Sequence, residues 1–204
     1  MSKEKMHTIL WFLALAIGLL GTFFIGYTRT ESLGEIQQGI AEEVFRFHVR
    51  ANSDSEDDQR VKMLVKEQVV DYLQAVLQDA ESVDETKKKI REQLSEIEAQ
   101  AETILKQENC DYKVHAKVGT SDFPEKVYGD CRFPAGSYDA LILDLGTGQG
   151  HNWWCMLYPG LCFLNESYGI VTTDKKAELE NVLTDTEFSW ITDWDKVHIS
   201  FKWF

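Results

Sequence analysis

The chain has 204 residues, of which 34 are acidic and 21 basic, so its formal net charge is −13. A surface this acidic argues against nucleic acid and anionic lipid headgroups as partners, because both bind through clustered lysine and arginine. Beyond a short N-terminal segment, the length suits one folded domain with a single hydrophobic core.

The N-terminal segment has the composition of a membrane anchor. Residues 8–27 contain no charged side chain and are mostly apolar, and about 20 such residues are long enough to cross a bilayer as a helix. Lys3 and Lys5 precede the run and Arg29 follows it, which favours a cytoplasmic N-terminus. No clean Ala-x-Ala cleavage site is present. We expect residues 1–28 to form an uncleaved transmembrane helix, with a cleaved signal peptide as the alternative, and the rest to be extracytoplasmic.

The four cysteines all lie in the part expected to be exported. An even number of cysteines in an exported domain predicts disulfide bonds. The short spacing favours a bond between Cys155 and Cys162 and leaves Cys110 and Cys131 as a second pair. The sequence proves neither bond. One alternative is a catalytic thiol, which needs a nearby base; the candidate bases are His48, His115, His151 and His198.

Two metal sites are also conceivable, and both lack part of the usual pattern. A zinc site would use Cys155, Cys162 and His151, but cysteine ligands are usually about two to four residues apart. A calcium site would use Asn52, Asp54 and Asp57, but the glycine and the distal glutamate of an EF-hand loop are absent. We therefore expect no metal and no cofactor.

Residues 29–43 are assigned to a polar connector, and the folded domain is expected to occupy residues 44–204. At its start, residues 44–50 alternate between apolar and basic side chains, which predicts a strand with one buried face. The apolar set expected to face the core is Phe45, Phe47 and Val49. The basic set expected to form an outward stripe, either solvated or a binding surface, is Arg46, His48 and Arg50.

Two amphipathic helices follow, each announced by a capping pattern. Ser55 with Asp58, or Ser53 with Glu56, would satisfy free backbone N–H groups at the start of a helix that continues through about residue 76. Ser82-Val83-Asp84-Glu85 predicts the start of a second helix, with apolar residues at helical spacing up to residue 105.

Further alternating segments predict more strands, at residues 112–118, 127–128, 131–133, 138–145 and 197–204. Most are close together in the sequence, so local hairpins are expected. The predicted fold class is α+β: a small, mostly antiparallel sheet packed by two amphipathic helices and preceded by one hydrophobic helix.

A tract rich in glycine and tryptophan occupies residues 146–163. Gly146, Gly148 and Gly150 resemble a loop that cradles phosphate, but no Lys-Ser or Lys-Thr pair follows. A flexible turn that positions the residues after it is the favoured interpretation. Trp153 and Trp154 either fill the core or anchor a partner, and the sequence does not decide between these roles.

Several motifs in order resemble one family. These are Arg50–Ser55 followed by Asp58-Gln59, then Phe123–Gly129, Phe133–Leu141 and Gly146–Phe163. Over roughly residues 44–165 the chain is similar to the stage II sporulation protein R family. The resemblance implies a non-enzymatic signalling protein of endospore-forming bacteria, exported from the forespore into the space between the two membranes. There it would activate a membrane-embedded aspartic protease of the SpoIIGA type, which removes the pro-sequence of sigma-E.

The resemblance supplies no catalytic residue, so candidates for the protease-binding surface come from loops at strand ends, where binding residues concentrate. They are Asn52, Ser53, Asp54, His151, Asn152, Trp153 and Trp154. Two alternatives belong to other classes: an exported enzyme, either a wall hydrolase or a thiol oxidoreductase using Cys155 and Cys162, and a structural module of the cell envelope.

Overall fold

The computed structural model describes residues 3–163 and 171–193, so the strand expected at 197–204 lies outside the described residues. The chain divides into two units, residues 1–38 and 39–204. Helix α1 (Lys3–Glu43) provides the first unit and the first residues of the second. The residues assigned to a connector, 29–43, are therefore helical. Among the described residues, no helix has both the length and the apolar character needed to cross a membrane.

The second unit is built on a mixed four-stranded sheet and confirms the predicted α+β class. The strand order is β2-β5-β1-β6; β1 runs parallel to β5, and the other neighbours are antiparallel. A separate two-stranded sheet pairs β3 with β4. The strands are β1 (Phe45–Arg50), β2 (Val114–Phe123), β3 (Lys126–Tyr128), β4 (Cys131–Phe133), β5 (Gly136–Leu145) and β6 (Asn152–Tyr158).

The expectation of mostly local hairpins is wrong for the main sheet. Its central strand β1 pairs on both sides with strands that come much later in the chain, as in the register pairs Arg50 with Asp144 and Arg50 with Asn152. Among the described strands, only β3 and β4 form a tight local hairpin. The reason is that a parallel pair requires a long crossover, and here three helices separate β1 from the other strands.

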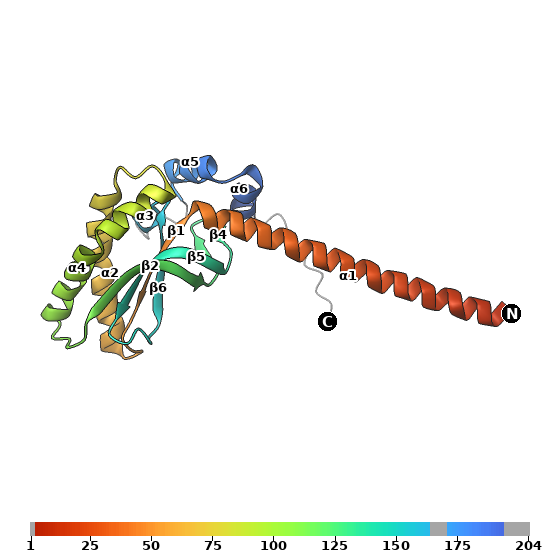
Figure 1. The fold of residues 1–204 in the computed structure, drawn as a ribbon, viewed down its shortest axis with the longest axis horizontal. Helices are drawn as coiled ribbons and strands as arrows, with labels where there is room; N and C mark the ends of the chain where they lie inside the picture. Colours follow the sequence, from red (N-terminus) through yellow and green to blue (C-terminus); the bar gives the residue numbers. More distant parts are fainter. Residues whose placement is uncertain (1–2, 164–170, 194–204) are drawn as a thin grey trace. The chain divides into compact units, whose positions relative to one another are not determined.

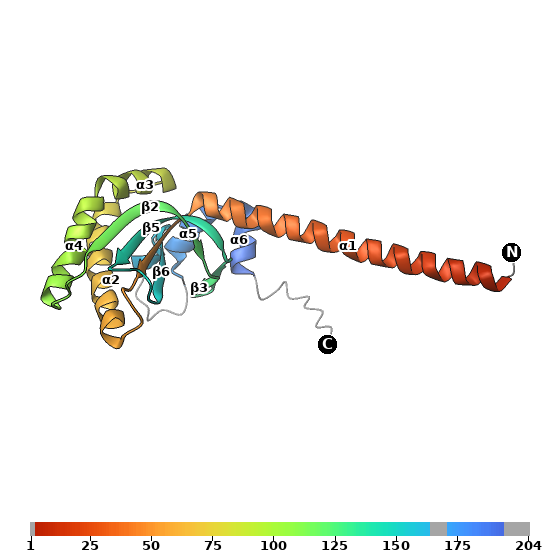
Figure 2. The same cartoon turned by 60° about the horizontal axis from the view of Figure 1, so that its bottom comes forward.

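Helices α2 (Glu56–Leu77), α3 (Val83–Glu92) and α4 (Leu94–Gln107) pack on one face of the sheet (Figures 1 and 2). The predicted caps are confirmed: Ser55 Oγ accepts from the Asp58 N–H and Ser82 Oγ from the Glu85 N–H, both at 3.2 Å. The single helix expected over 82–105 is instead two helices. They meet at Gln93, whose backbone leaves the helical region with φ −106° and ψ 4°; its side chain accepts a 2.5 Å hydrogen bond from Tyr72 Oη.

The core between these helices and the sheet contains the predicted apolar face of β1. Phe45, Phe47 and Val49 are fully buried there. The outward basic stripe is wrong for two of its three members, since Arg46 is 0 % and His48 1 % exposed. Because β1 is a central strand, its second face is covered as well, which is usual for strands with a parallel neighbour.

Aromatic rings cover that second face of β1. The Arg46 guanidinium lies 4.4 Å from the centre of the Phe123 ring and 4.8 Å from that of Tyr138. Only Arg50 reaches the surface, where its Nε and Nη2 bind both carboxylate oxygens of Asp144, the latter at 2.7 Å.

In the part of the chain that the structure describes, three short elements follow β6: η1 (Leu161–Phe163), α5 (Thr173–Val182) and α6 (Asp185–Thr192). Thr184 and Glu187 form a reciprocal capping box at the start of α6. An ion pair between Lys176 and Asp130 joins α5 to the turn between β3 and β4. These elements therefore belong to the same folded unit as the sheet.

Candidate partner-binding site

The fold brings the two groups of candidate residues together. Arg50, at the end of β1, is paired with Asn152, at the start of β6. The loop that follows β1 therefore lies beside the loop that precedes β6. The first loop carries Asn52, Ser53 and Asp54, and the second leads into His151, Asn152 and the two tryptophans. They are about 100 residues apart in the sequence.

Hydrogen bonds join the two loops into one unit. Asn52 accepts from Thr147 at two atoms: Oδ1 from the backbone N–H at 3.1 Å and the carbonyl from the hydroxyl at 2.7 Å. The Gly150 N–H donates to the Ala51 carbonyl at 2.9 Å. Gly146 has a positive φ of 58°, and a Cβ built there would lie 2.2 Å from Asn52 Oδ1. Glycine is thus required for the loops to approach this closely.

Asp58 organises the first loop from within. Its carboxylate accepts hydrogen bonds from Ser53 Oγ at 2.5 Å, Asn52 Nδ2 at 2.9 Å and Tyr112 Oη at 2.9 Å. Burial raises the pKa of Asp58, but these hydrogen bonds outweigh burial and hold the pKa below its ordinary value. The side chains of Asn52 and Ser53 therefore hold the loop in shape, and their role in binding a partner stays a prediction.

Asp54 and His151 form the exposed part of the site. Asp54 Oδ1 accepts from the His151 backbone N–H at 2.6 Å and lies 2.5 Å from its ring Nδ1. The backbone hydrogen bond, followed by the ring contact, lowers the pKa of Asp54. Their side chains are 56 % and 80 % exposed. Lys62 Nζ donates to the His151 carbonyl at 3.1 Å, which ties the second loop to α2.

The alternatives of a phosphate loop and a calcium site find no support in this geometry. The N–H groups of Gly146, Gly148 and Gly150 all donate to backbone carbonyls of the protein, at 2.8–3.1 Å. These donors are not available to a phosphate. Among the described residues, no group of three or more His, Cys, Asp or Glu side chains is placed to hold a metal ion.

The two tryptophans are half-buried and lie on opposite faces of β6. Trp153 packs edge-on against Phe47 in the core at 5.7 Å between ring centroids, and Lys66 Nζ lies 5.3 Å from the centre of its ring. Trp154 stacks on His48 and meets the Phe123 ring at 4.7 Å. Each tryptophan therefore combines a packed part with an accessible part.

Two hollows lie beside the tryptophans. The first, of about 300 Å³, is called the edge hollow here; both tryptophans line it together with Lys66, Glu67, Val70, Asp71, Tyr128, Cys155, Leu161 and Cys162. The second, of about 360 Å³, is lined by Asp54, Gln149, Gly150, His151, Asn152 and Trp154. Trp154 lines both hollows and so connects them.

Comparison with known proteins assigns the chain to a family. A sequence model described as Stage II sporulation protein R matches residues 41–168, a range that includes both loops of the site. The Stage II sporulation protein R of Bacillus subtilis (strain 168) is 33 % identical over 192 residues, covering 91 % of this chain and 84 % of the relative. This chain belongs to the stage II sporulation protein R family. No solved structure matches it.

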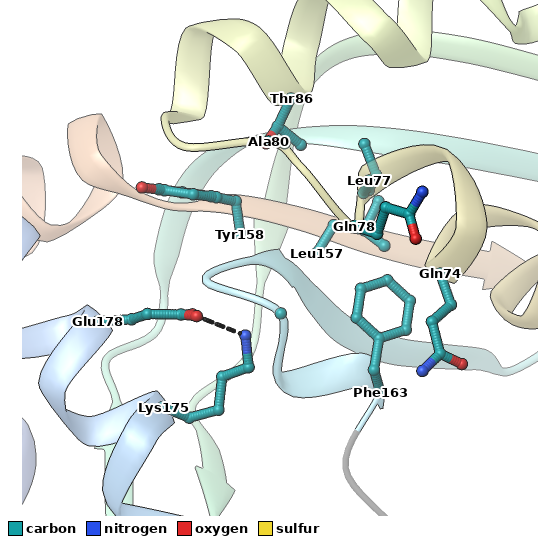
Figure 3. A pocket seen from close by; sticks show the side chains of 11 residues that line it. Gln74, Leu77, Gln78, Ala80, Thr86, Leu157, Tyr158, Phe163, Lys175 and Glu178 are labelled. Atoms are coloured by element: carbon teal, nitrogen blue, oxygen red, sulfur yellow. Dashed lines mark hydrogen bonds and ion pairs between the residues drawn. The ribbon is translucent and has the colours of Figure 1, made fainter.

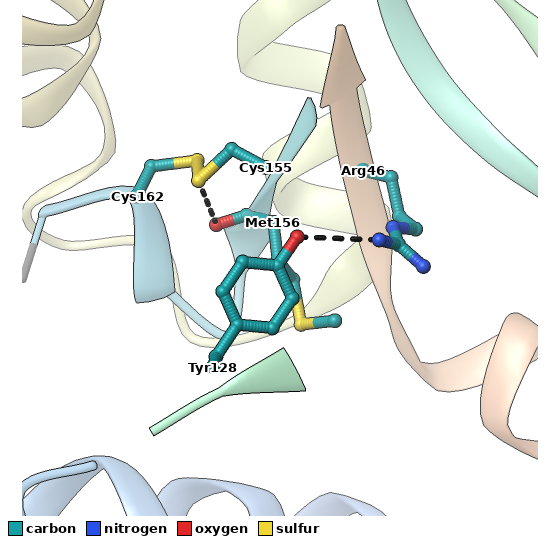
Figure 4. The surroundings of a disulfide bond; sticks show 5 residues. All are labelled: Arg46, Tyr128, Cys155, Met156 and Cys162. Carbon is teal, nitrogen blue, oxygen red and sulfur yellow. Dashed lines mark hydrogen bonds between the residues drawn. A yellow bond between two sulfur atoms is a disulfide. The ribbon is translucent and has the colours of Figure 1, made fainter. Parts of the chain in front are cut away.

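In this stage II sporulation protein R family member, a disulfide bond joins Cys155 in β6 to Cys162 in η1, with 5.5 Å between their Cα atoms (Figure 4). The zinc site and the thiol oxidoreductase's free dithiol would need these two sulfurs unbonded. Cys110 and Cys131, the second candidate pair, are both free thiols. That pairing is therefore wrong: Cys110 follows α4, whereas Cys131 begins β4 in the small sheet. Burial raises the pKa of Cys131 to about 11, which keeps it a thiol at neutral pH.

A third hollow of this family member, of about 320 Å³, lies around the end of α2, Tyr158, Phe163 and α5 (Figure 3). Its charged groups already pair with one another, since Lys175 Nζ lies 2.7 Å from Glu178. Tyr158 Oη donates to the Glu81 carbonyl at 2.9 Å. These polar groups of the third hollow are therefore satisfied within the protein.

The site also depends on a residue that the sequence placed on an outward stripe. The His48 ring stacks against the buried side of Trp154. Neither ring nitrogen of His48 has a hydrogen-bond partner among the described residues. Burial, and then the nearby Arg50, lowers the pKa of His48 from 6.5 to about 4. The imidazole is thus neutral at physiological pH and acts as a flat apolar support.

Proposed function

We propose that this chain is an extracytoplasmic sporulation signal that binds and activates a membrane-embedded aspartic protease, which then removes the pro-sequence of sigma-E. The observation that carries the proposal is the family match, which runs through both joined loops. The name of the Bacillus subtilis relative places that protein in the second stage of sporulation. The identities of the protease and of its substrate are inferred from the resemblance of the sequence motifs to this family.

Export is part of the proposal. The uncharged run at 8–27 would act as a membrane anchor or a signal peptide, leaving the folded unit in the space between forespore and mother cell. In α1, large apolar side chains such as Trp11 and Phe23 are 77 % and 75 % exposed, a cost that a lipid environment would remove. The disulfide bond between Cys155 and Cys162 suits an oxidising compartment.

The loops are suited to recognition because they are already ordered. The hydrogen bonds of Asn52 with Thr147 and of Asp54 with His151 hold the surface residues in place before a partner arrives. Binding to an ordered surface costs less conformational entropy than binding to a mobile one. A protein that binds the active state of its receptor more tightly shifts the receptor toward that state. This population shift is the proposed mechanism of activation.

The test is reconstitution in a non-sporulating host. The chain, the candidate protease and pro-sigma-E are co-expressed, and removal of the pro-sequence is followed by gel mobility. We expect cleavage that requires this chain with its residues 1–28, and none when those residues are deleted or when the protease carries a substituted catalytic aspartate. Absence of cleavage with a folded, exported chain and a competent protease would contradict the proposal.

A further inference from the structure

Strand β6 lies at the edge of the main sheet. Its inner side pairs with β1, and no described strand pairs with its outer side. An edge strand presents unpaired N–H and C=O groups, which readily pair with another extended chain unless something covers them. The sheet has a second edge at β2, but there the Ala116 N–H already donates to Glu98 Oε1 at 2.8 Å. We therefore consider the outer side of β6 as the place where an added strand would fit.

The edge hollow lies directly beside this outer side. Successive side chains of a strand point to opposite faces of the sheet, so Trp153 and Trp154 belong to different faces. A hollow lined by both must extend around the edge between the faces. Its other walls are α2, through Lys66 and Val70, on one face and Tyr128 on the other. It offers about 300 Å³, enough for side chains of an added segment.

The disulfide bond limits how much of the edge is open. It brings Cys162 of η1 back beside Cys155, and the strand residues Cys155, Met156 and Leu157 are at most 4 % exposed. The residues before it, from Asn152 to Trp154, are only half-buried. The accessible part of the edge is thus short, and its end is marked by the covalent bridge.

A buried positive charge without a counter-charge among the described residues lies behind the edge hollow. Arg46 is fully buried; its Nε and Nη1 have no hydrogen-bond partner and it has no ion pair among the described residues. Its Nη2 donates to Tyr128 Oη at 3.2 Å (Figure 4). A buried charge without a counter-charge is costly. The two aromatic rings over Arg46 offset only part of that cost.

Tyr128 connects this charge to the edge hollow. Its oxygen accepts from Arg46, so its own hydroxyl proton remains to be donated, and no described residue accepts it. The phenol lines the hollow. A carboxylate that entered there would accept a hydrogen bond from the Tyr128 hydroxyl and provide a negative charge near Arg46, which no described residue provides. The charged side chains that line the hollow, Lys66, Glu67 and Asp71, do not favour an acidic occupant. The acidic contact therefore rests on the Arg46–Tyr128 pair.

We propose that the outer edge of β6 at residues 152–154 takes up an extended segment of a partner protein as an added strand, and that an acidic side chain of this segment binds the Tyr128 hydroxyl. Strand addition of this kind draws affinity from main-chain hydrogen bonds and specificity from the side-chain pocket. The inference rests on the proposed function for the partner's identity, which is the extracytoplasmic part of the protease. The edge itself follows from this chain alone.

Hydrogen exchange on the complex tests the strand without any mutation. The full-length chain and the full-length protease are combined in detergent, and exchange of the β6 amides is compared with that of the free chain. We expect new protection confined to alternate residues of 152–154, because only alternate N–H groups point away from β1. A complex in which these amides exchange as in the free chain would overturn the proposal.

Proline substitutions then remove the pairing itself. One of Asn152 and Trp153 directs its N–H outward, since successive residues alternate. Proline is tolerated at an edge position whose N–H faces outward, so the strand backbone accepts one of N152P and W153P. W153P and W153T both lose the contact of Trp153 with Phe47, so each is compared with the other and not with the parent. We expect the accepted proline variant to lose at least about tenfold in affinity for the protease relative to its matched threonine variant, N152T or W153T. The threonine keeps the N–H, so equal binding by the pair would contradict strand addition.

The acidic contact has its own matched pair of variants. Y128F keeps the ring but removes the hydroxyl, and we expect about tenfold weaker binding, as for the loss of a hydrogen bond to a charged group. Y158F makes the same change outside the edge hollow and should bind like the parent. If Y128F and Y158F bind the protease equally well, the proposed hydrogen bond between Tyr128 and an acidic side chain of the partner is wrong.

The outcomes separate this inference from the proposed function. If the unmodified chain fails to bind or activate the protease, the proposed function fails. If it binds and activates but the proline variant is unimpaired, only the strand addition fails. If the free chain forms dimers in sedimentation and the dimer shows the β6 protection, a second copy occupies the edge and the partner segment is overturned.

Discussion

Trp154 lies flat on His48: the two rings are parallel to within 2° and their centroids are 4.8 Å apart. One residue belongs to the half-buried edge strand and the other is 1 % exposed in the central strand. The contact connects the candidate surface to the interior of the sheet. Changes in the protonation of His48 should therefore be felt both in stability and at Trp154.

The free energy of unfolding should decrease as the pH falls from about 6.5 to about 4. Burial lowers the pKa of His48 to about 4 in the folded chain, against 6.5 when unfolded, so the unfolded chain binds the proton first. The contribution is fully present above about pH 6.5 and is lost by about pH 4, amounting to about 3 kcal/mol. Urea titrations across this range, followed by tryptophan fluorescence, measure it.

Matched variants identify the group. H48F keeps a flat ring against Trp154 but cannot titrate, so its stability should vary much less over this pH range. H115Q removes a histidine whose side chain is 71 % exposed and should keep the dependence of the parent. A parent-like pH dependence in H48F would show that another group is responsible.

Replacing Gly150 with alanine should destabilise the joined loops. A Cβ at this position would lie 2.2 Å from the backbone oxygen of Ser53 in the other loop. This oxygen is part of the main chain, so it cannot move aside as the end of a flexible side chain could. Forced separation of packed atoms costs about 1–3 kcal/mol. We expect a lower melting temperature for G150A. G119A adds a Cβ in open space and should melt close to the parent; equal melting of both variants would argue against the close approach.

Loss of the disulfide bond should lower stability through the unfolded state. The bridge between Cys155 and Cys162 closes a short loop, for which the chain-entropy relation gives about 2–3 kcal/mol. C155S with C162S should therefore unfold at lower urea, and the parent should behave in the same way after reduction. C110S, at a free thiol, should change stability little. A parent-like midpoint for the double variant would show that the bridge contributes nothing.

Trp154→Ala should impair activation of the protease by more than its loss of stability explains. The side chain lines both hollows, and an anchoring tryptophan contributes about 2–4 kcal/mol at an interface. We expect pro-sigma-E processing to fall at least tenfold while the variant is still exported and folded, as judged by melting and by its disulfide bond.

Trp190→Ala is the control for that experiment. Trp190 is also half-buried but belongs to α6 and lines neither hollow. The Trp190→Ala substitution should lower the stability of the chain. At equal amounts of folded protein, this variant should activate the protease as well as the parent does. If both tryptophan variants lose activation in proportion to their stability, Trp154 acts as core and the proposed anchor is lost.

The sequence by itself determined the local elements and the family. The alternation at 45–50 indicates β1, and the caps Ser55 and Ser82 mark two helix starts, because these signals act within a few residues. It also placed the candidate residues at strand ends. It did not predict the helix break at Gln93, where a distant tyrosine contributes the hydrogen bond.

Only the tertiary structure decided which surfaces are open. Arg46 and His48 have the spacing of an outward stripe, but the parallel pairing of β1 with β5 makes β1 a central strand and buries both of its faces. The same pairing brings Asn52 to Thr147, 95 positions later in the chain. It leaves β6 at the edge with Trp153 and Trp154. Strand order depends on contacts between distant segments, and a periodic pattern within one segment carries no information about them.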